Sequence, residues 1–188
     1  MKVIKSKLRD ALIIAPKIFK DKRGYFVESF NSEKFDENIG HFDIVQINKS
    51  KSKYGVLRGL HFQKPPYNQA KIVEVLKGII LDVIVDIRTD SQTFGQYQSF
   101  LLDDIDMVQI YVPRGFAHGF VVLSSHAIIQ YKVDNVYAPE YDTGIRFDDS
   151  TLNIDWEVQS PVLSDKDKTW GNFDAMKFYR KSEYWGNV

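Results

Sequence analysis

The chain has 188 residues, which is long enough for one domain with a substantial core and short for two. Its 25 Lys and Arg residues balance 25 Asp and Glu residues, so the formal net charge is zero and the usual electrostatic argument for nucleic acid or an anionic membrane as main partner is absent. The chain has no cysteine, which excludes disulfides, thiolate chemistry and cysteine-based zinc sites.

The first ten residues carry charges where a signal peptide needs an apolar core. No apolar run approaches the roughly 20 residues that span a bilayer. We therefore expect a cytoplasmic protein with neither a membrane nor a nucleic-acid partner.

The N-terminal part predicts a hairpin followed by a short helix and another strand. The hairpin covers residues 11–30 and is bent at Pro16, which cannot donate to a sheet ladder. The helix is predicted from about Glu33 to Asn38, with Ser32 as its N-terminal cap. Residues 42–49 alternate between apolar and polar, which is typical of a strand with one buried face.

Short strands continue through the middle of the chain, separated by turns. They are predicted over residues 55–62, 71–88 (two strands with a turn at 77–78), 96–102, 108–112, a segment ending at 123, and 127–133. This pattern, with little helix, predicts a mainly β fold, an antiparallel cupin-like jelly-roll barrel with short helices near both termini. We expect a single domain over 1–188, with the barrel core at about 42–135. Loops and a short helix over about 160–188 would pack on the barrel or on a second subunit.

The strand that begins at residue 55 carries an unusual set of polar side chains. His61 and Gln63 are two positions apart and share one face of a regular strand, whereas Arg58 lies three positions before His61. A bulge at Gly59 would bring Arg58 to the same face. Lys71 opens the next apolar run, and such cations suit an anionic group such as a diphosphate or an enolate.

A metal site is the first alternative for these residues, because a cupin-like barrel often binds a metal. His118 follows Pro113 and Gly115 at the spacing of a late cupin histidine. At the early position, however, Gln63 replaces the second histidine, and an amide is a poor ligand for a transition metal. We therefore expect no metal. His61 would then act as a general base, and Tyr131 would be either a proton donor or a core aromatic.

Eight motifs occur in order along residues 10–170 and together resemble the deoxythymidine-diphosphate (dTDP)-4-dehydrorhamnose 3,5-epimerase family. The most specific is GVLRGLHFQ at 55–63. The others are DKRGYFVE at 21–28, QIN at 46–48, QAK at 69–71, DVIVDIR at 82–88, PRGFAHGF at 113–120, YK at 131–132 and LSDKD at 163–167.

The resemblance implies a cofactor-free, metal-free homodimer that epimerises dTDP-4-dehydro-6-deoxy-D-glucose at C3 and C5 to dTDP-4-dehydro-L-rhamnose, through an enolate. It implies that His61 is the base and that Asp167 orients it. Tyr131 would be the acid on the opposite face of the sugar, and Lys71 would stabilise the enolate oxygen.

The resemblance also implies a set of residues that bind the substrate. Arg58, Gln63, Asp82 and His118 would lie in the pocket, with Arg58 near the phosphates or the sugar. The nucleotide would be held by Arg23, Glu28, Gln46, Asn48 and Tyr137, with Tyr25 near the sugar or the base. In this family the N-terminal hairpin exchanges between subunits, so Arg23 and Glu28 would serve the partner's site.

Two positions depart from the family pattern, and three other functions stay open. Asp142 stands where a longer acid is common, and Arg146-Phe147 stands where tryptophan often occurs. Both positions lie near the nucleotide end, so the motifs determine the nucleotide base less well than the chemistry at the sugar. The other functions are epimerisation at C3 alone or on a different nucleotide sugar, non-catalytic binding of a nucleotide sugar, and metal-dependent cupin chemistry.

Overall fold

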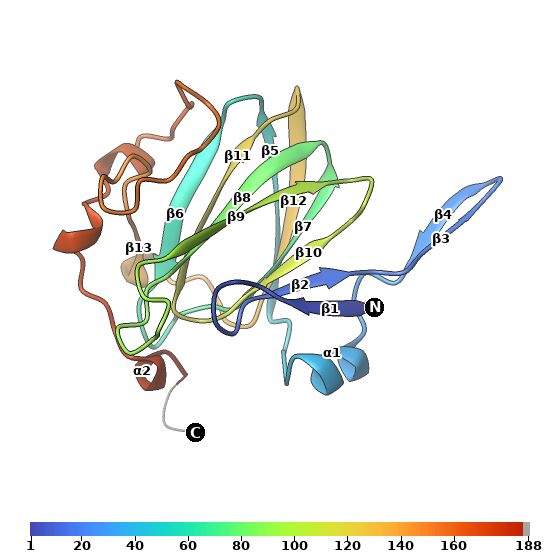
Figure 1. Ribbon diagram of the computed structural model, residues 1–188, viewed down its shortest axis with the longest axis horizontal. Coiled ribbons are helices and arrows are strands. Elements are labelled where there is room, and N and C mark those ends of the chain that lie inside the picture. Colours follow the sequence, from blue (N-terminus) through green and yellow to red (C-terminus); the bar gives the residue numbers. More distant parts are fainter. Residues whose placement is uncertain (186–188) are drawn as a thin grey trace.

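Two antiparallel sheets face each other and form a barrel in the computed structural model, which describes residues 1–185 (Figure 1). The last three residues of the expected domain and C-terminal region lie outside this range. The six-stranded sheet has the order β1 (Lys2–Lys5), β2 (Leu12–Ala15), β10 (Gln109–Val112), β7 (Lys71–Lys77), β12 (His126–Val133) and β5 (Gln46–Lys53).

The five-stranded sheet completes the jelly roll. Its order is β13 (Asp142–Gly144), β6 (Leu57–Gln63), β11 (Phe116–Val122), β8 (Ile79–Asp86) and β9 (Tyr97–Asp103). Every pairing within both sheets is antiparallel, and short helices lie near the two ends of the chain. The predicted mainly β, jelly-roll fold is confirmed.

Strand alternation divides the apolar side chains between two cores. Ile80 and Ile84 of β8 point between the sheets, whereas Leu81, Val83 and Val85 of the same strand point outward. The outward side chains are covered by the C-terminal segment, whose buried members include Trp156, Phe173 and Tyr184. The aromatic C-terminal segment therefore packs on the barrel, one of the two places expected for it.

Short helical turns accompany the C-terminal segment. They are 3₁₀ turns at Pro139–Tyr141, Asp167–Thr169 and Phe173–Ala175, and the helix α2 (Lys181–Trp185). None of the helices within residues 1–185 is long and apolar enough to cross a membrane.

The helix α1 (Ser32–Asn38) corrects two details of the prediction. Its N-terminal cap is Asn31, not Ser32, because the Asn31 side chain accepts a hydrogen bond of 3.2 Å from the Lys34 amide. The strand predicted over 42–49 runs over 46–53 instead, since Phe42 packs beside Phe35 of the helix.

A two-stranded hairpin of β3 (Ile18–Asp21) and β4 (Gly24–Val27) projects away from the barrel (Figure 1). It is shorter than the expected 11–30, because β2 joins the six-stranded sheet beside β10. The sheets likewise extend beyond the expected 42–135 to include β1, β2 and β13. Three aromatic side chains of the hairpin, Phe19, Tyr25 and Phe26, are 51%, 61% and 68% exposed.

Candidate functional site

A cavity of about 220 Å³ is lined by side chains from both sheets. Its walls contain histidine, lysine, arginine, tyrosine and carboxylate groups together with a few apolar side chains. The lining residues are Asn48, Arg58, His61, Phe62, Gln63, Gln69, Lys71, His118, Phe120, Tyr131, Val133, Tyr137 and Asp142. Eight of these residues belong to the predicted site, although up to 89 positions separate them in the chain.

A bulge in β6 brings Arg58 and His61 to this one cavity. His61 pairs with His118 of β11 and Arg58 pairs with Phe120, so three steps along β6 match two steps along β11. Gly59 lies at the bulge, and a Cβ atom there would be 2.5 Å from the Cα atom of Gly119. The predicted bulge is confirmed, and the backbones of β6 and β11 approach closely at Gly59.

His61 is held by a buried carboxylate. Its Nε2 atom donates a hydrogen bond to Asp167, which also accepts one of 2.8 Å from the Ser164 hydroxyl and one of 3.3 Å from the Trp170 indole. Burial by itself would raise the pKa of Asp167, but these hydrogen bonds, led by that from His61, outweigh burial and lower the pKa. The ionised carboxylate therefore fixes the orientation of the imidazole.

A second histidine–carboxylate pair lies beside the first. His118 Nε2 is 2.7 Å from Asp82 Oδ2, and both residues are buried. The other carboxylate oxygen of Asp82 is buried and has no hydrogen-bond partner among the described residues. Asp82 thus lies behind His118 and not on the cavity wall.

Tyr131 approaches the cavity from the other sheet. It lies on β12 of the six-stranded sheet, whereas His61 lies on β6 of the five-stranded sheet. Its ring packs against the inner core, and its hydroxyl donates a hydrogen bond of 2.8 Å to Ser50 Oγ. The two predicted proton-transfer groups therefore enter the cavity from facing sheets.

Lys71 begins β7, in the same sheet as Tyr131. Burial lowers its pKa, and the nearby carboxylates of Asp142 and Asp82 oppose this shift by favouring the charged amine. The site therefore contains a partly desolvated cation next to two acids.

Side chains near one end of β5 form a hydrogen-bonded chain with Tyr137. Gln46 donates a bond of 2.8 Å to Asn48 Oδ1 and accepts one of 3.1 Å from the Tyr137 amide. The Tyr137 hydroxyl donates to Asp142 at 2.9 Å, and Lys166 pairs with the same carboxylate. Gln46 itself does not line the cavity but holds two residues that do.

The amide of Gln63 is occupied by backbone groups. Its nitrogen donates to the carbonyl oxygens of Tyr67 and Val136 at 2.5 and 3.1 Å, and its oxygen accepts from the Ala138 amide at 2.7 Å. These hydrogen bonds hold the loops that follow β6 and β12 against the Gln63 side chain. The geometry gives Gln63 a role in holding the Tyr137 loop; because Gln63 also lines the cavity, its contact with substrate stays a prediction.

Three of the predicted nucleotide-binding residues lie on or beside the projecting hairpin and, like Gln46, outside this cavity. Arg23 and Tyr25 are exposed on the projecting hairpin, and Glu28 follows it directly. Within the chain Arg23 pairs with Asp21 at 2.6 Å, and Glu28 pairs with Lys34 at 2.5 Å.

Sequence reasoning missed two serines of β5 that contact site residues. Ser50 accepts from the Tyr131 hydroxyl, and Ser52 accepts from Arg58 Nε at 3.1 Å. The available signal was the alternation of polar side chains along 46–52, since even-numbered residues of this strand share one face. That face looks toward the site.

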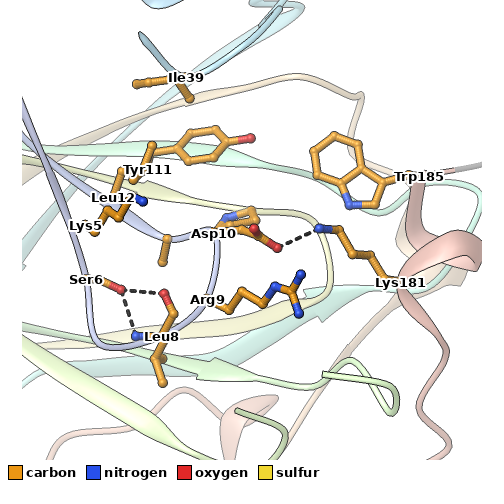
Figure 2. A pocket seen from close by; sticks show the side chains of 12 residues that line it. Lys5, Ser6, Leu8, Arg9, Asp10, Leu12, Ile39, Tyr111, Lys181 and Trp185 are labelled. Atoms are coloured by element: carbon orange, nitrogen blue, oxygen red, sulfur yellow. Dashed lines mark hydrogen bonds and ion pairs between the residues drawn. The ribbon is translucent and has the colours of Figure 1, made fainter. Parts of the chain in front are cut away.

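A larger cavity, of about 570 Å³, lies near the β1–β2 loop and the C-terminal helix (Figure 2). The lining that the described residues provide contains no histidine, and its single carboxylate, Asp10, is bound to Lys181 at 2.7 Å. The histidine and the tyrosine that are predicted to transfer protons, His61 and Tyr131, line the smaller cavity. Among residues 1–185, no cluster of three or more His, Asp or Glu residues is placed to hold a metal ion.

Comparison with known proteins supports the family that the sequence motifs resemble. Residues 5–175 match the family described as dTDP-4-dehydrorhamnose 3,5-epimerase. A curated relative of that name from Shigella flexneri is 49% identical over 168 residues, which cover 89% of this chain and 93% of the relative.

Two solved structures are also similar. A dTDP-6-deoxy-D-glucose-3,5-epimerase from Legionella pneumophila, in complex with dTDP-4-keto-L-rhamnose, has a TM-score of 0.92 and 40% identity over 95% of this chain and 97% of that one. A 3'-monoepimerase from Streptomyces bikiniensis, in complex with dTDP-quinovose, has a TM-score of 0.85 and 32% identity over 89% and 85% of the two chains. With the family match spanning most of the sequence and the motif residues gathered in one cavity, this chain belongs to the dTDP-4-dehydrorhamnose 3,5-epimerase family.

Proposed function

We propose that this protein epimerises dTDP-4-dehydro-6-deoxy-D-glucose at C3 and C5 to give dTDP-4-dehydro-L-rhamnose, a step of dTDP-L-rhamnose biosynthesis. The observation that carries the proposal is the placement of His61 and Tyr131, which line one cavity from facing sheets. Inversion at a carbon needs a proton acceptor on one side of the sugar and a proton donor on the other. This cavity offers that arrangement.

The reaction begins at the C4 carbonyl, which acidifies the hydrogens on C3 and C5. His61 removes a proton through the ring nitrogen that is not bound to Asp167, and the ionised Asp167 stabilises the imidazolium that forms. The electron pair moves onto the C4 oxygen to give an enolate. Tyr131 then delivers a proton to the opposite face of the same carbon, and repetition at the second carbon completes the reaction.

Lys71 supplies the positive charge that the enolate requires. A cation fixed beside the developing oxyanion lowers the barrier most where water is excluded, and Lys71 is partly desolvated. Burial lowers the pKa of the Lys71 amine, and the carboxylates of Asp142 and Asp82 oppose that shift by favouring the charged form.

At alkaline pH the activity is expected to fall as Lys71 loses its proton. The pKa of this amine lies below its ordinary value of 10.5, so the charge disappears as the pH rises through that lowered value. Lys71→Arg keeps a positive charge at every accessible pH and should move the alkaline decline of kcat upward. Lys71→Gln should be weakly active throughout. A decline at unchanged pH in Lys71→Arg would exclude Lys71 as its cause.

The nucleotide end of the substrate would contact both the cavity and a second copy of the chain. Arg58, Asn48 and Tyr137 line the cavity. The projecting hairpin exposes aromatic side chains to water, which is unfavourable. This exposure supports a homodimer in which the hairpin covers the partner's site. In this dimer Arg23, Tyr25 and Glu28 would bind the partner's nucleotide.

Epimerisation at C3 alone is the second candidate. The Streptomyces bikiniensis 3'-monoepimerase shares the fold of this chain, so architecture by itself does not separate the two activities. A non-catalytic binding module is disfavoured, because binding does not require an oriented histidine, a facing tyrosine and a buried lysine together.

Proton NMR of the 4-keto-6-deoxyglucose nucleotide, incubated with the protein in deuterated water, tests the proposal. We expect solvent deuterium at both C3 and C5 and formation of the L-lyxo sugar. Deuterium at C3 alone would establish the monoepimerase. Absence of exchange at both carbons would contradict catalysis on this substrate.

A further inference from the structure

The hydroxyl group of Ser50 is the contact of Tyr131 that the proposed mechanism leaves unused. Tyr131 donates to Ser50 Oγ at 2.8 Å, across the pairing of β12 with β5. Ser50 is half-buried, and β5 is the edge strand of its sheet. The serine therefore contacts the phenol while remaining partly accessible to solvent.

We propose that Ser50 is a positioning residue for the acid step and the route by which Tyr131 regains its proton. The proposal rests on the assignment of Tyr131 as the acid. When the phenol O–H bond breaks and the new C–H bond forms on the sugar, the hydroxyl of Ser50 turns to donate to the phenolate. Its proton passes to Tyr131, and Ser50 takes another from water. The proton that His61 removed returns to water, so the cycle consumes no net proton.

A hydroxyl suits this position because it can both accept and donate. It accepts from the neutral phenol before the transfer and donates to the phenolate after it, whereas a carboxylate only accepts and an alkyl group does neither. A hydrogen bond to the phenolate stabilises the charged form that the acid step creates.

Neighbouring polar groups of the cavity are engaged elsewhere. His118 is bound to Asp82 at 2.7 Å, and Ser52 accepts from Arg58 at 3.1 Å. Among the described residues, Ser50 is the group with which Tyr131 shares a hydrogen bond. Because Ser50 is half-buried, its hydroxyl contacts the phenol and is also within reach of water.

Ser50→Ala is expected to lower kcat roughly tenfold to a hundredfold, the effect of losing one hydrogen bond to a charged group, with little change in KM. Deuterium exchange at the substrate carbons should fall less than product formation, because the base is untouched. Ser50→Thr, which keeps the hydroxyl, should recover most of the activity. Ser99→Ala makes the same chemical change at an exposed position of β9 and should leave both rates unchanged.

The decisive test is a double-mutant cycle with Tyr131→Phe. If Ser50 acts through the phenol, adding Ser50→Ala to Tyr131→Phe should cause no further loss of kcat. If the double variant loses kcat by the product of the two single losses, the proposal is overturned, and the serine would bind substrate directly. If Ser50→Ala does not fold, as judged by circular dichroism, Ser50→Cys supplies a thiol of similar size and a weaker donor for the same cycle.

The cycle also separates this inference from the proposed function. Full activity in Tyr131→Phe would overturn the acid assignment and the role of Ser50 together. A strong loss in Tyr131→Phe with a multiplying effect of Ser50→Ala would overturn the role of Ser50 alone.

Discussion

Replacing His61 with alanine is expected to abolish both hydrogen exchange and epimerisation, lowering kcat by more than about a hundredfold, the contribution typical of a general base. The reason is that every turnover begins with removal of a proton, and His61 is a half-buried cavity histidine that an ionised carboxylate orients. The measurement is deuterium incorporation at C3 and C5, followed by NMR beside the rate of product formation.

Two further variants locate the cause of that loss. Asp167→Asn removes the carboxylate charge while keeping the shape of the side chain. It should therefore make His61 a weaker base while preserving the packing around it. His41→Ala changes a histidine whose side chain is 75% exposed and should retain full activity. Normal exchange in the His61→Ala protein would show that another group is the base.

Tyr131→Phe is expected to reduce product formation far more than deuterium exchange. The phenylalanine ring keeps the packing of Tyr131 against the inner core but cannot deliver a proton. The enolate still forms, and its proton returns more often from the side of His61, which restores the starting sugar with deuterium in place of hydrogen. Equal loss of exchange and product would exclude Tyr131 as the acid.

The folded state provides the control for Tyr131→Phe. The lost hydroxyl bonds only to the half-buried Ser50 among the described residues, so the free energy of unfolding should change by about 1 kcal/mol or less. Urea unfolding of both proteins measures this difference. A large destabilisation would mean that lost activity reflects lost structure.

Local pattern was enough to predict most of the barrel. Period-two alternation and glycine-containing turns marked the principal strands, and the spacing of Arg58, Gly59 and His61 indicated a bulge that the pairing with β11 contains. The pattern missed β1 and β13, which are only four and three residues long. The first of them carries lysine at both ends, so its alternation is hidden.

Local propensity does not decide which residue caps the N-terminus of the helix α1. Asn31 and Ser32 are adjacent and both are good capping residues, so composition cannot choose between them. The choice depends on where the chain leaves the hairpin and on the burial of Phe35, which sets the phase of the helix.

The sequence by itself determined the fold class, the family and the identity of most of the groups in the cavity. Tertiary structure decided how they work together, because strand alternation assigns faces within one strand but not the distant segment that meets them. The carboxylate that orients His61 lies 106 positions away, and the serine that meets Tyr131 lies 81 positions away. Only the folded chain brings the amide of Gln63 to its backbone partners, since these belong to the loops that follow β6 and β12.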